Sequence, residues 1–299
     1  MRTLAELASQ ITLVKPVAER KQRKKMMDIM TKDKEKISSD IVYKYYSPTE
    51  YNLDALINRY FWFSKRSALN DPYDMNLQVL EVFQKFKELL KDHGYDLEAY
   101  NKTLNDFAIC CFTKRPENQH FWSLYAGNFQ GWCLEFEQDN LVNPAGGVPN
   151  KLHDVIYLDE VPNLDDKYQH LEIEKNEDGS SRSETIVGLL YNEKTQEELF
   201  TYLLRIKNRD IWSAEEECRL ILGNIYLMTH KQHNNAGYRI PWKENALKRI
   251  IIGYRMPEYL RKIILMFAKE NSVPVSVATP DLQNRQFTIK IEQIEPIKI

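Results

Sequence analysis

The part of the sequence that most limits the fold is a strand–helix–strand pattern near its end. Residues 249–252 and 274–277 are short runs rich in isoleucine and valine, and residues 257–269 between them have apolar side chains at helical spacing. A helix between two strands returns the chain to the same end of a sheet, so the two strands lie parallel. The pattern predicts a sheet with a helix packed against it.

Further strands are predicted throughout the chain. Their shared signature is a short apolar or alternating run, found at residues 41–45, 60–63, 107–112, 132–137, 154–160 and 218–222. Ser47, Pro48 and Glu50 have the spacing of a capping box and predict a short helix after the first strand. A long helix is expected over residues 184–207. We predict an α+β fold with a mixed, largely antiparallel central sheet and flanking helices.

The expected organisation is a basic N-terminal arm, residues 1–40, followed by a single α+β domain over residues 41–299. A polar insertion is expected near residues 163–184, where acidic side chains surround a Gly-Ser turn. The arm has two interpretations. It is either a solvated helix or a contact for nucleic acid or a partner protein.

Composition narrows the classes of protein. The 41 basic and 43 acidic side chains give a net charge of −2, so the whole chain has no strong field to attract nucleic acid or a membrane. We find neither a membrane-spanning run nor a secretion signal, and we expect a cytoplasmic protein that has no membrane partner. The four cysteines lack the spacing of a zinc site and are expected to be small buried side chains in a reducing compartment.

The most informative polar segment contains Glu215, Glu217 and Arg219. In an extended chain these alternate residues project from one face, which would bring two carboxylates and a guanidinium together. Such a cluster is either a structural ion pair or a site suited to a cationic transition state.

A turn at residues 70–74 supplies a second group of polar side chains. Asn70, Asp71 and Asp74 could bind a divalent cation, or they could bond to their own turn. We favour the second interpretation and predict no metal site, including at His230 and His233, which are three residues apart.

Several separate blocks, in order, resemble a bacterial family catalogued as domain of unknown function 2971. The resemblance covers about residues 41–277, and the family implies no established activity. Its blocks are Val42–Tyr45, Phe63–Ser64, Leu69–Asp74, Cys111–Thr113, Phe121–Ala126 with Gly131, Trp212 with Glu215, Glu217 and Arg219, and Ile251–Gly253. Tyr46 departs from the arginine that many members have there, which weakens an anion-binding role at that position.

A weaker similarity is to ADP-ribosyltransferases, which place a basic or histidine residue on a first strand, a serine or aromatic residue on a second, and a glutamate on a late strand. Lys44, Ser64 and Glu217, the last within Glu215-x-Glu217, occur in this order. The similarity implies an enzyme that uses NAD as co-substrate. Breaking the bond between nicotinamide and ribose builds positive charge on the sugar, which a carboxylate stabilises.

In this hypothesis Glu217 and Glu215 are the catalytic residues. Glu217 would hold the ribose and Glu215 would orient the acceptor. The nucleotide would be bound by the remaining candidates, namely Lys44 at the diphosphate, Ser64, Arg219, and Trp122 or Tyr125 stacked on nicotinamide.

The competing hypothesis is a non-catalytic binding or interaction module, for example in a bacterial defence or stress system. Burial separates the two: a catalytic site should open Glu217 and Lys44 into one pocket, whereas a scaffold should hold them in separate contacts. A third class, metal-dependent phosphodiester cleavage through Asp71 and Asp74, would require a further carboxylate near them.

Overall fold

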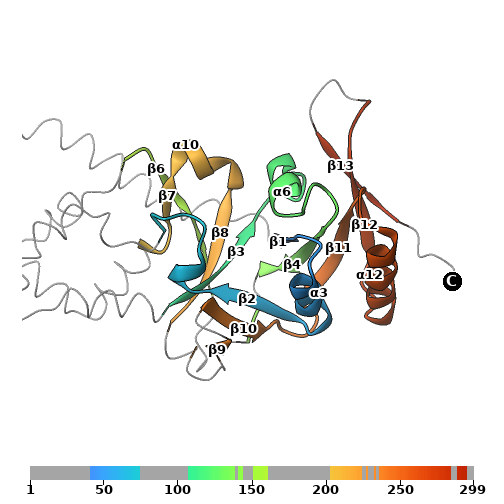
Figure 1. Ribbon diagram of the computed structural model, residues 1–299, viewed down its shortest axis with the longest axis horizontal. Helices are drawn as coiled ribbons and strands as arrows, with labels where there is room; N and C mark the ends of the chain where they lie inside the picture. Colours follow the sequence, from blue (N-terminus) through green and yellow to red (C-terminus); the bar gives the residue numbers. More distant parts are fainter. Residues whose placement is uncertain are drawn as a thin grey trace, which may run out of the picture. The chain divides into compact units, whose positions relative to one another are not determined.

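A computed structural model of the chain describes residues 41–74, 107–138, 141–143, 151–160, 203–223, 227, 232–233, 236–283 and 288–294. The predicted arm, the polar insertion, His230 and most of the long helix lie outside these ranges. The described strands form an 11-stranded sheet and a separate two-stranded sheet (Figure 1). The larger sheet is mixed and mostly antiparallel, which confirms the predicted α+β class.

Nine of the eleven strands follow one another across the large sheet. From one edge to the other they are β13 (Ile289–Gln293), β12 (Val275–Pro280), β11 (Leu247–Gly253), β4 (Trp132–Glu137), β1 (Ile41–Tyr46), β3 (Ala108–Thr113), β2 (Tyr60–Ser64), β10 (Gly237–Pro241) and β9 (Gln232–His233). Off this path, β8 (Glu217–Leu222) pairs with β3 and with β5 (Leu152–Asp154). The smaller sheet joins β6 (Ile156–Leu158) to β7 (Ile206–Asn208) in parallel.

The predicted strand–helix–strand unit is confirmed. Strands β11 and β12 pair in parallel, and helix α12 (Glu258–Glu270) connects them. Leu260, Ile264 and Ala268 recur along the helix at intervals of four and are its buried side chains. Helix α12 therefore covers the sheet with one apolar stripe.

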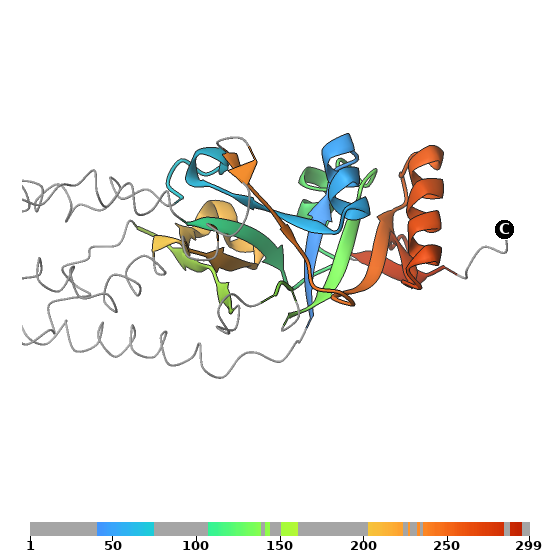
Figure 2. The ribbon, with the colours of Figure 1, turned by 90° about the horizontal axis from the view of Figure 1, so that it is seen from below.

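The two faces of the sheet are buried by different helices. One face is covered by α12 and by α3 (Glu50–Ile57), which stand side by side in Figure 2. The alternation in β4 places Trp132, Leu134 and Phe136 in this larger core. The other face contains a smaller cluster under helix α6 (Gln119–Leu124), which includes Cys133. All four cysteines are free and Cys111 alone is only partly buried, close to the prediction of small buried side chains.

Strand β3 has an unusual environment, because β8 follows its whole length while β1 and β2 share its other edge. Strand β1 pairs with β3 only at Tyr43–Thr113, and β2 pairs with it only at Ser64–Ile109. We call the gap between these two contacts the β1–β2 split. The middle of β3 borders this split.

Three local predictions are wrong in detail. Helix α3 is capped by Thr49, whose side chain accepts a hydrogen bond from the amide of Asn52, and not by Ser47. The Ser47 hydroxyl instead accepts from the Asn52 side chain. Residues 206–207, expected as the end of the long helix, belong instead to strand β7, which pairs with β6. The predicted strand at 154–160 is divided into β5 and β6.

Candidate functional site

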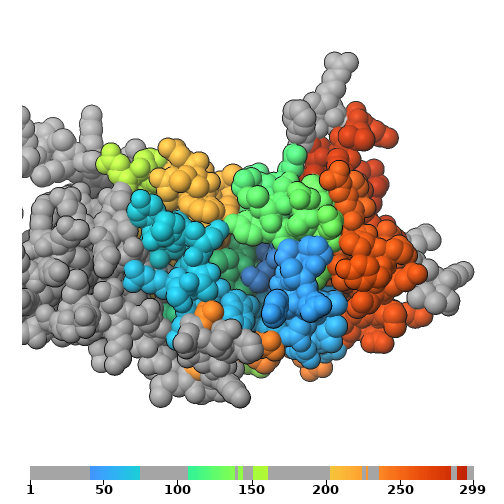
Figure 3. Space-filling model, in the orientation of Figure 1, coloured from blue at the N-terminus to red at the C-terminus, as the bar shows by residue number. Residues whose placement is uncertain are grey.

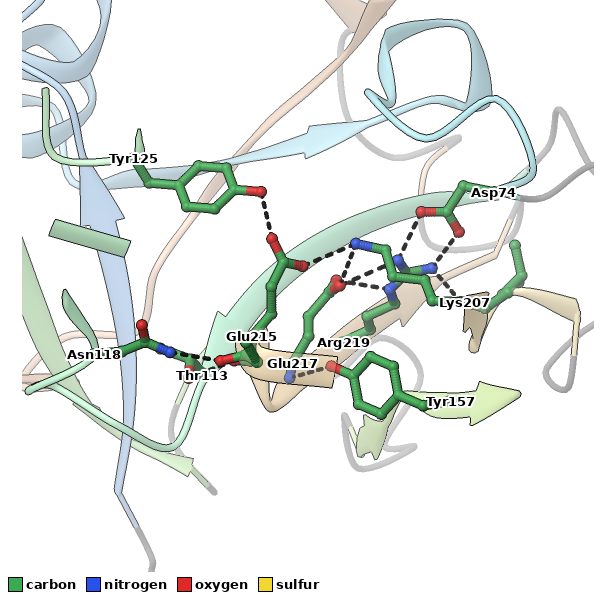
Figure 4. A network of polar contacts seen from close by, with 11 residues as sticks. Asp74, Thr113, Asn118, Tyr125, Tyr157, Lys207, Glu215, Glu217 and Arg219 are labelled. Carbon is green, nitrogen blue, oxygen red and sulfur yellow. Dashed lines mark hydrogen bonds and ion pairs between the residues drawn. The ribbon is translucent and has the colours of Figure 1, made fainter. Parts of the chain in front are cut away.

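A buried network of charged side chains is centred on Arg219 of β8 (Figure 4). The guanidinium is 0% exposed and donates to both carboxylate oxygens of Asp74, at 2.6 and 2.7 Å. It also donates to Glu217 Oε1 at 2.7 Å and to the Leu204 carbonyl at 2.8 Å. A buried guanidinium needs partners for its donors, and Arg219 receives them from Glu217 on its own strand, from Leu204, and from the distant Asp74.

Lys207 of β7 is the second cation of the network. Its ammonium lies 3.0 Å from Glu215 Oε2 and 2.7 Å from Glu217 Oε2, and it sits over the Trp212 ring at 4.4 Å from the centroid. Burial by itself lowers the pKa of Lys207, but the carboxylates of Glu217 and Glu215 raise it above its ordinary value. Lys207 is therefore a permanently charged bridge between the two glutamates.

The two glutamates reach Lys207 through a backbone reversal. Glu215 ends the 3₁₀ helix η4 (Ser213–Glu215), Glu216 has a left-handed φ of 42°, and Glu217 begins β8. The reversal turns Glu216 outward, where it pairs with Arg115 at 2.8 Å. The prediction that Glu217 and Arg219 share a face is confirmed by their direct contact, whereas Glu215 joins them through this turn and not through strand alternation.

Neighbouring segments are fastened to the same network. The Tyr125 hydroxyl, just after α6, donates to Glu215 Oε1 at 2.5 Å, and the Thr113 hydroxyl donates to the Glu215 carbonyl at 2.9 Å. The Glu217 amide donates to the Tyr157 hydroxyl of β6 at 2.8 Å. Burial, followed by the hydrogen bond to Glu215, raises the pKa of Tyr125, which keeps its hydroxyl a donor.

Glu217 is a permanently ionised and fully paired carboxylate. Its side chain is buried, which by itself raises its pKa, but Arg219 and Lys207 lower the pKa from 4.5 to about 2. Asp74 behaves differently: burial raises its pKa despite the opposing effect of Arg219. At neutral pH Glu217 neither gives nor takes a proton, so its chemical capacity is to hold cations.

Lys44 lies apart from Glu217. Its ammonium donates to the Cys111 carbonyl at 3.0 Å and lies over the Phe112 ring, in the larger core. The strand register aligns Tyr43, Thr113 and Glu217 across β1, β3 and β8, so Lys44, one residue after Tyr43, projects from the opposite face. The structure thus places the predicted cation and anion on different faces of the sheet.

The other predicted binding residues are also dispersed. Ser64 ends β2 opposite Ile109, at the far end of β3 from Glu217. Trp122 is 0% exposed, its indole nitrogen donates to the Pro116 carbonyl at 2.8 Å, and its ring stacks on Phe129 at 5.5 Å between centroids. Only Tyr125, Glu215, Glu217 and Arg219 are brought together.

The turn at residues 70–74 serves the network and its own backbone. Asp71 Oδ1 accepts from the Tyr73 amide at 2.9 Å, and both oxygens of Asp74 bind Arg219. No group of three or more histidine, cysteine, aspartate or glutamate side chains with metal-binding geometry occurs in the parts of the chain that the structure describes. The favoured interpretation of this turn, bonding within the protein, agrees with these contacts.

Sequence reasoning missed Lys207, Tyr157 and the pairing of Asp74 with Arg219. The sequence pattern predicts a helix up to Lys207, and no local pattern connects this residue to Glu217, ten residues later. One local signal was available. Lys207 follows the apolar Ile206 and precedes Asn208, which caps the next short helix, α10 (Arg209–Trp212), so the long helix has to end before this point.

Comparison with known proteins gives one family. Residues 121–220 match the model of a family described as protein of unknown function (DUF2971). The match overlaps the region of the predicted resemblance and includes most of α6, all of β4 and part of β8. No curated protein and no solved structure matches the chain. None of the helices that the structure describes is both long and apolar enough to cross a membrane.

Proposed function

We propose that the protein is a non-catalytic binding module whose buried charge network fixes the segments around it. The observation behind this proposal is the state of Glu217, which is 4% exposed with both oxygens paired to Arg219 and Lys207. A carboxylate that stabilises a ribosyl cation has to contact the sugar. Both oxygens of Glu217 are already occupied by protein cations, which supports a structural role.

The network also supplies preorganisation, which a binding surface requires. Asp74 links the end of the segment 66–74 to β8 through its hydrogen bonds with Arg219. Tyr125 links the end of α6 to η4 through its hydrogen bond to Glu215, and the Asn118 side chain donates to the Ala214 carbonyl at 2.6 Å. Three segments far apart in sequence are thereby fixed to one another. Segments that are ordered before binding lose less conformational entropy when a ligand arrives.

The test is an assay for NAD turnover. Purified wild type and Glu217→Gln would be incubated with NAD, and nicotinamide release would be measured at a temperature at which circular dichroism shows both folded. Glu135→Gln is the matched control, because Glu135 is also ion-paired, with Arg249, but on β4. We expect no release from any of the three proteins. Release by wild type and Glu135→Gln, but not by folded Glu217→Gln, would refute the proposal.

An NAD-using, ADP-ribosyltransferase-like enzyme is the second candidate. The observation in its favour is topological: Lys44, Ser64 and Glu217 lie on β1, β2 and β8, the three strands that pair with β3. Catalysis would require Lys44 and Glu217 to face one substrate across this strand. The same nicotinamide measurement decides between the two candidates.

A further inference from the structure

The β1–β2 split offers a recess at the edge of β3. Strands β1 and β2 pair with β3 only near its two ends, at Thr113 and Ile109, so the β3 backbone between these positions is unpaired on this edge. Figure 3 shows a hollow at this place, bounded by α6, α3 and the segment 60–74, with parts of β1 and β3 at its base. Polar groups in this recess can meet a ligand from solvent.

Lys44 places a positive charge in the split. Its side chain is only partly buried, its ammonium donates a hydrogen bond to the Cys111 carbonyl at 3.0 Å, and the centroids of the Phe112 and Tyr46 rings lie 5.5 and 5.8 Å away. Among the residues that the structure describes, no carboxylate pairs with it. An ammonium has three donors, and a partly desolvated cation is stabilised by an anion.

Tyr46 supplies an independent observation. Its side chain is 5% exposed, its ring stacks on Trp132, and its hydroxyl is a buried polar atom with no hydrogen-bond partner in the described parts of the chain. Burial raises the pKa of Tyr46 well above its ordinary value, so the hydroxyl remains a donor. A buried donor without a partner is costly, and it is satisfied when a ligand supplies an acceptor.

Lys44 and Tyr46 are neighbours: they are two residues apart on β1 and so project from one face, and the Lys44 ammonium lies 5.8 Å from the centroid of the Tyr46 ring. Lys44 acts on the pKa of Cys110, and Cys110 in turn acts on that of Tyr46. Burial keeps the pKa of Cys110 raised in spite of Lys44, so the thiol stays neutral. The ammonium and the Tyr46 ring therefore lie side by side, and the thiol next to them carries no negative charge.

We propose that Lys44 and Tyr46 bind a small oxyanion, the carboxylate or phosphate group of a small molecule, in the β1–β2 split. One anion oxygen accepts from the ammonium and another accepts from the phenol, while Phe112 forms an apolar side of the site. This inference rests on the proposed binding function and names its ligand class. It requires no covalent step.

The first test is isothermal titration of the full chain with inorganic phosphate and, separately, with acetate, at constant ionic strength. We expect saturable binding of one anion per chain, and the preferred anion distinguishes a phosphate from a carboxylate ligand. Lys44→Met should weaken binding about tenfold or more, as expected for a lost charge-assisted hydrogen bond. Lys65→Met is the matched control, because Lys65 also lies over a tyrosine ring, that of Tyr238 at 5.5 Å. Its affinity should equal that of wild type.

Tyr46→Phe keeps the proposal testable if Lys44→Met fails to fold. Removing a hydroxyl that has no partner leaves the unfolding temperature of the free protein equal or higher. The rise in unfolding temperature on adding the anion should nevertheless shrink, with affinity falling about threefold to tenfold.

Three results would overturn the site: no saturable binding of either anion, equal weakening in Lys65→Met, or a full anion-induced shift in Tyr46→Phe. These outcomes are independent of nicotinamide release, which tests the non-catalytic function by itself.

Discussion

Glu217→Gln is the substitution that most directly measures the charge network. The amide has nearly the same shape as the carboxylate, so packing is preserved while one buried negative charge is lost. Arg219 retains Asp74 and Lys207 retains Glu215, so each cation keeps one carboxylate. The change therefore isolates what the Glu217 charge contributes to stability.

The magnitude follows from the pKa of Glu217, which the network lowers from 4.5 to about 2. Because the folded state holds this carboxylate ionised more strongly than the unfolded state, the ionised form stabilises the fold by about 3 kcal/mol at neutral pH. A carboxyl group whose pKa is lower in the folded state stabilises the fold fully at pH values above its pKa in the unfolded state. This stabilisation is lost as the pH falls through its pKa in the folded state. The Glu217 contribution should decline between about pH 4.5 and pH 2.

The assay is urea unfolding of wild type and Glu217→Gln, followed by circular dichroism at several pH values. We expect the variant to be less stable by about 3 kcal/mol at pH 7, with the difference falling to about 1 kcal/mol near pH 3. A difference below about 1 kcal/mol at pH 7, the value typical of exposed pairs, would refute the reasoning. So would a large difference that does not change with pH.

Three further predictions concern local features. Gly253→Ala should lower the free energy of unfolding by about 3 kcal/mol or more, because the added Cβ would lie 2.0 Å from the Phe129 carbonyl oxygen. Gly223→Ala is the control in the same urea experiment, because its Cβ would lie 3.4 Å from the nearest atom, in the Phe107 ring. Glu216→Asn should leave stability unchanged or raise it by about 0.5 kcal/mol, because asparagine tolerates the left-handed backbone better; a clear loss in thermal unfolding would contradict this. Alkylation of Cys111 in the native protein should be at least about tenfold slower than that of a free thiol, because burial raises the pKa of Cys111 well above its ordinary value. Mass spectrometry of the labelled peptide measures the rate of alkylation.

Elements with a strong internal period could be predicted from the sequence. Strand β4 alternates apolar and polar side chains, and α12 repeats buried residues every four positions, so each pattern shows which face is buried. Strand β7 could not be predicted, because its three residues are held by pairing with β6 and not by a pattern of their own. The cap of α3 was misplaced by two residues because Ser47 and Thr49 are both good capping residues.

The candidate site was predictable only in part. Glu217 and Arg219 are two apart on one strand, so their shared face follows from alternation. Asp74 and Lys207 join them through tertiary packing, which a local pattern does not encode. The same limit applies to Lys44, whose face depends on the register of β1 against β3 and not on its order in the sequence.

The pairing of Asp74 with Arg219 also has a consequence for how the chain acquires its structure. The two residues are 145 positions apart, so the carboxylate leaves the ribosome long before its guanidinium has been synthesised. Contacts with such large sequence separation form late and slow the folding of the domains that depend on them. Until β8 is translated, β3 lacks one neighbour along its whole length, so the nascent chain exposes an unpaired strand edge of the kind that favours aggregation.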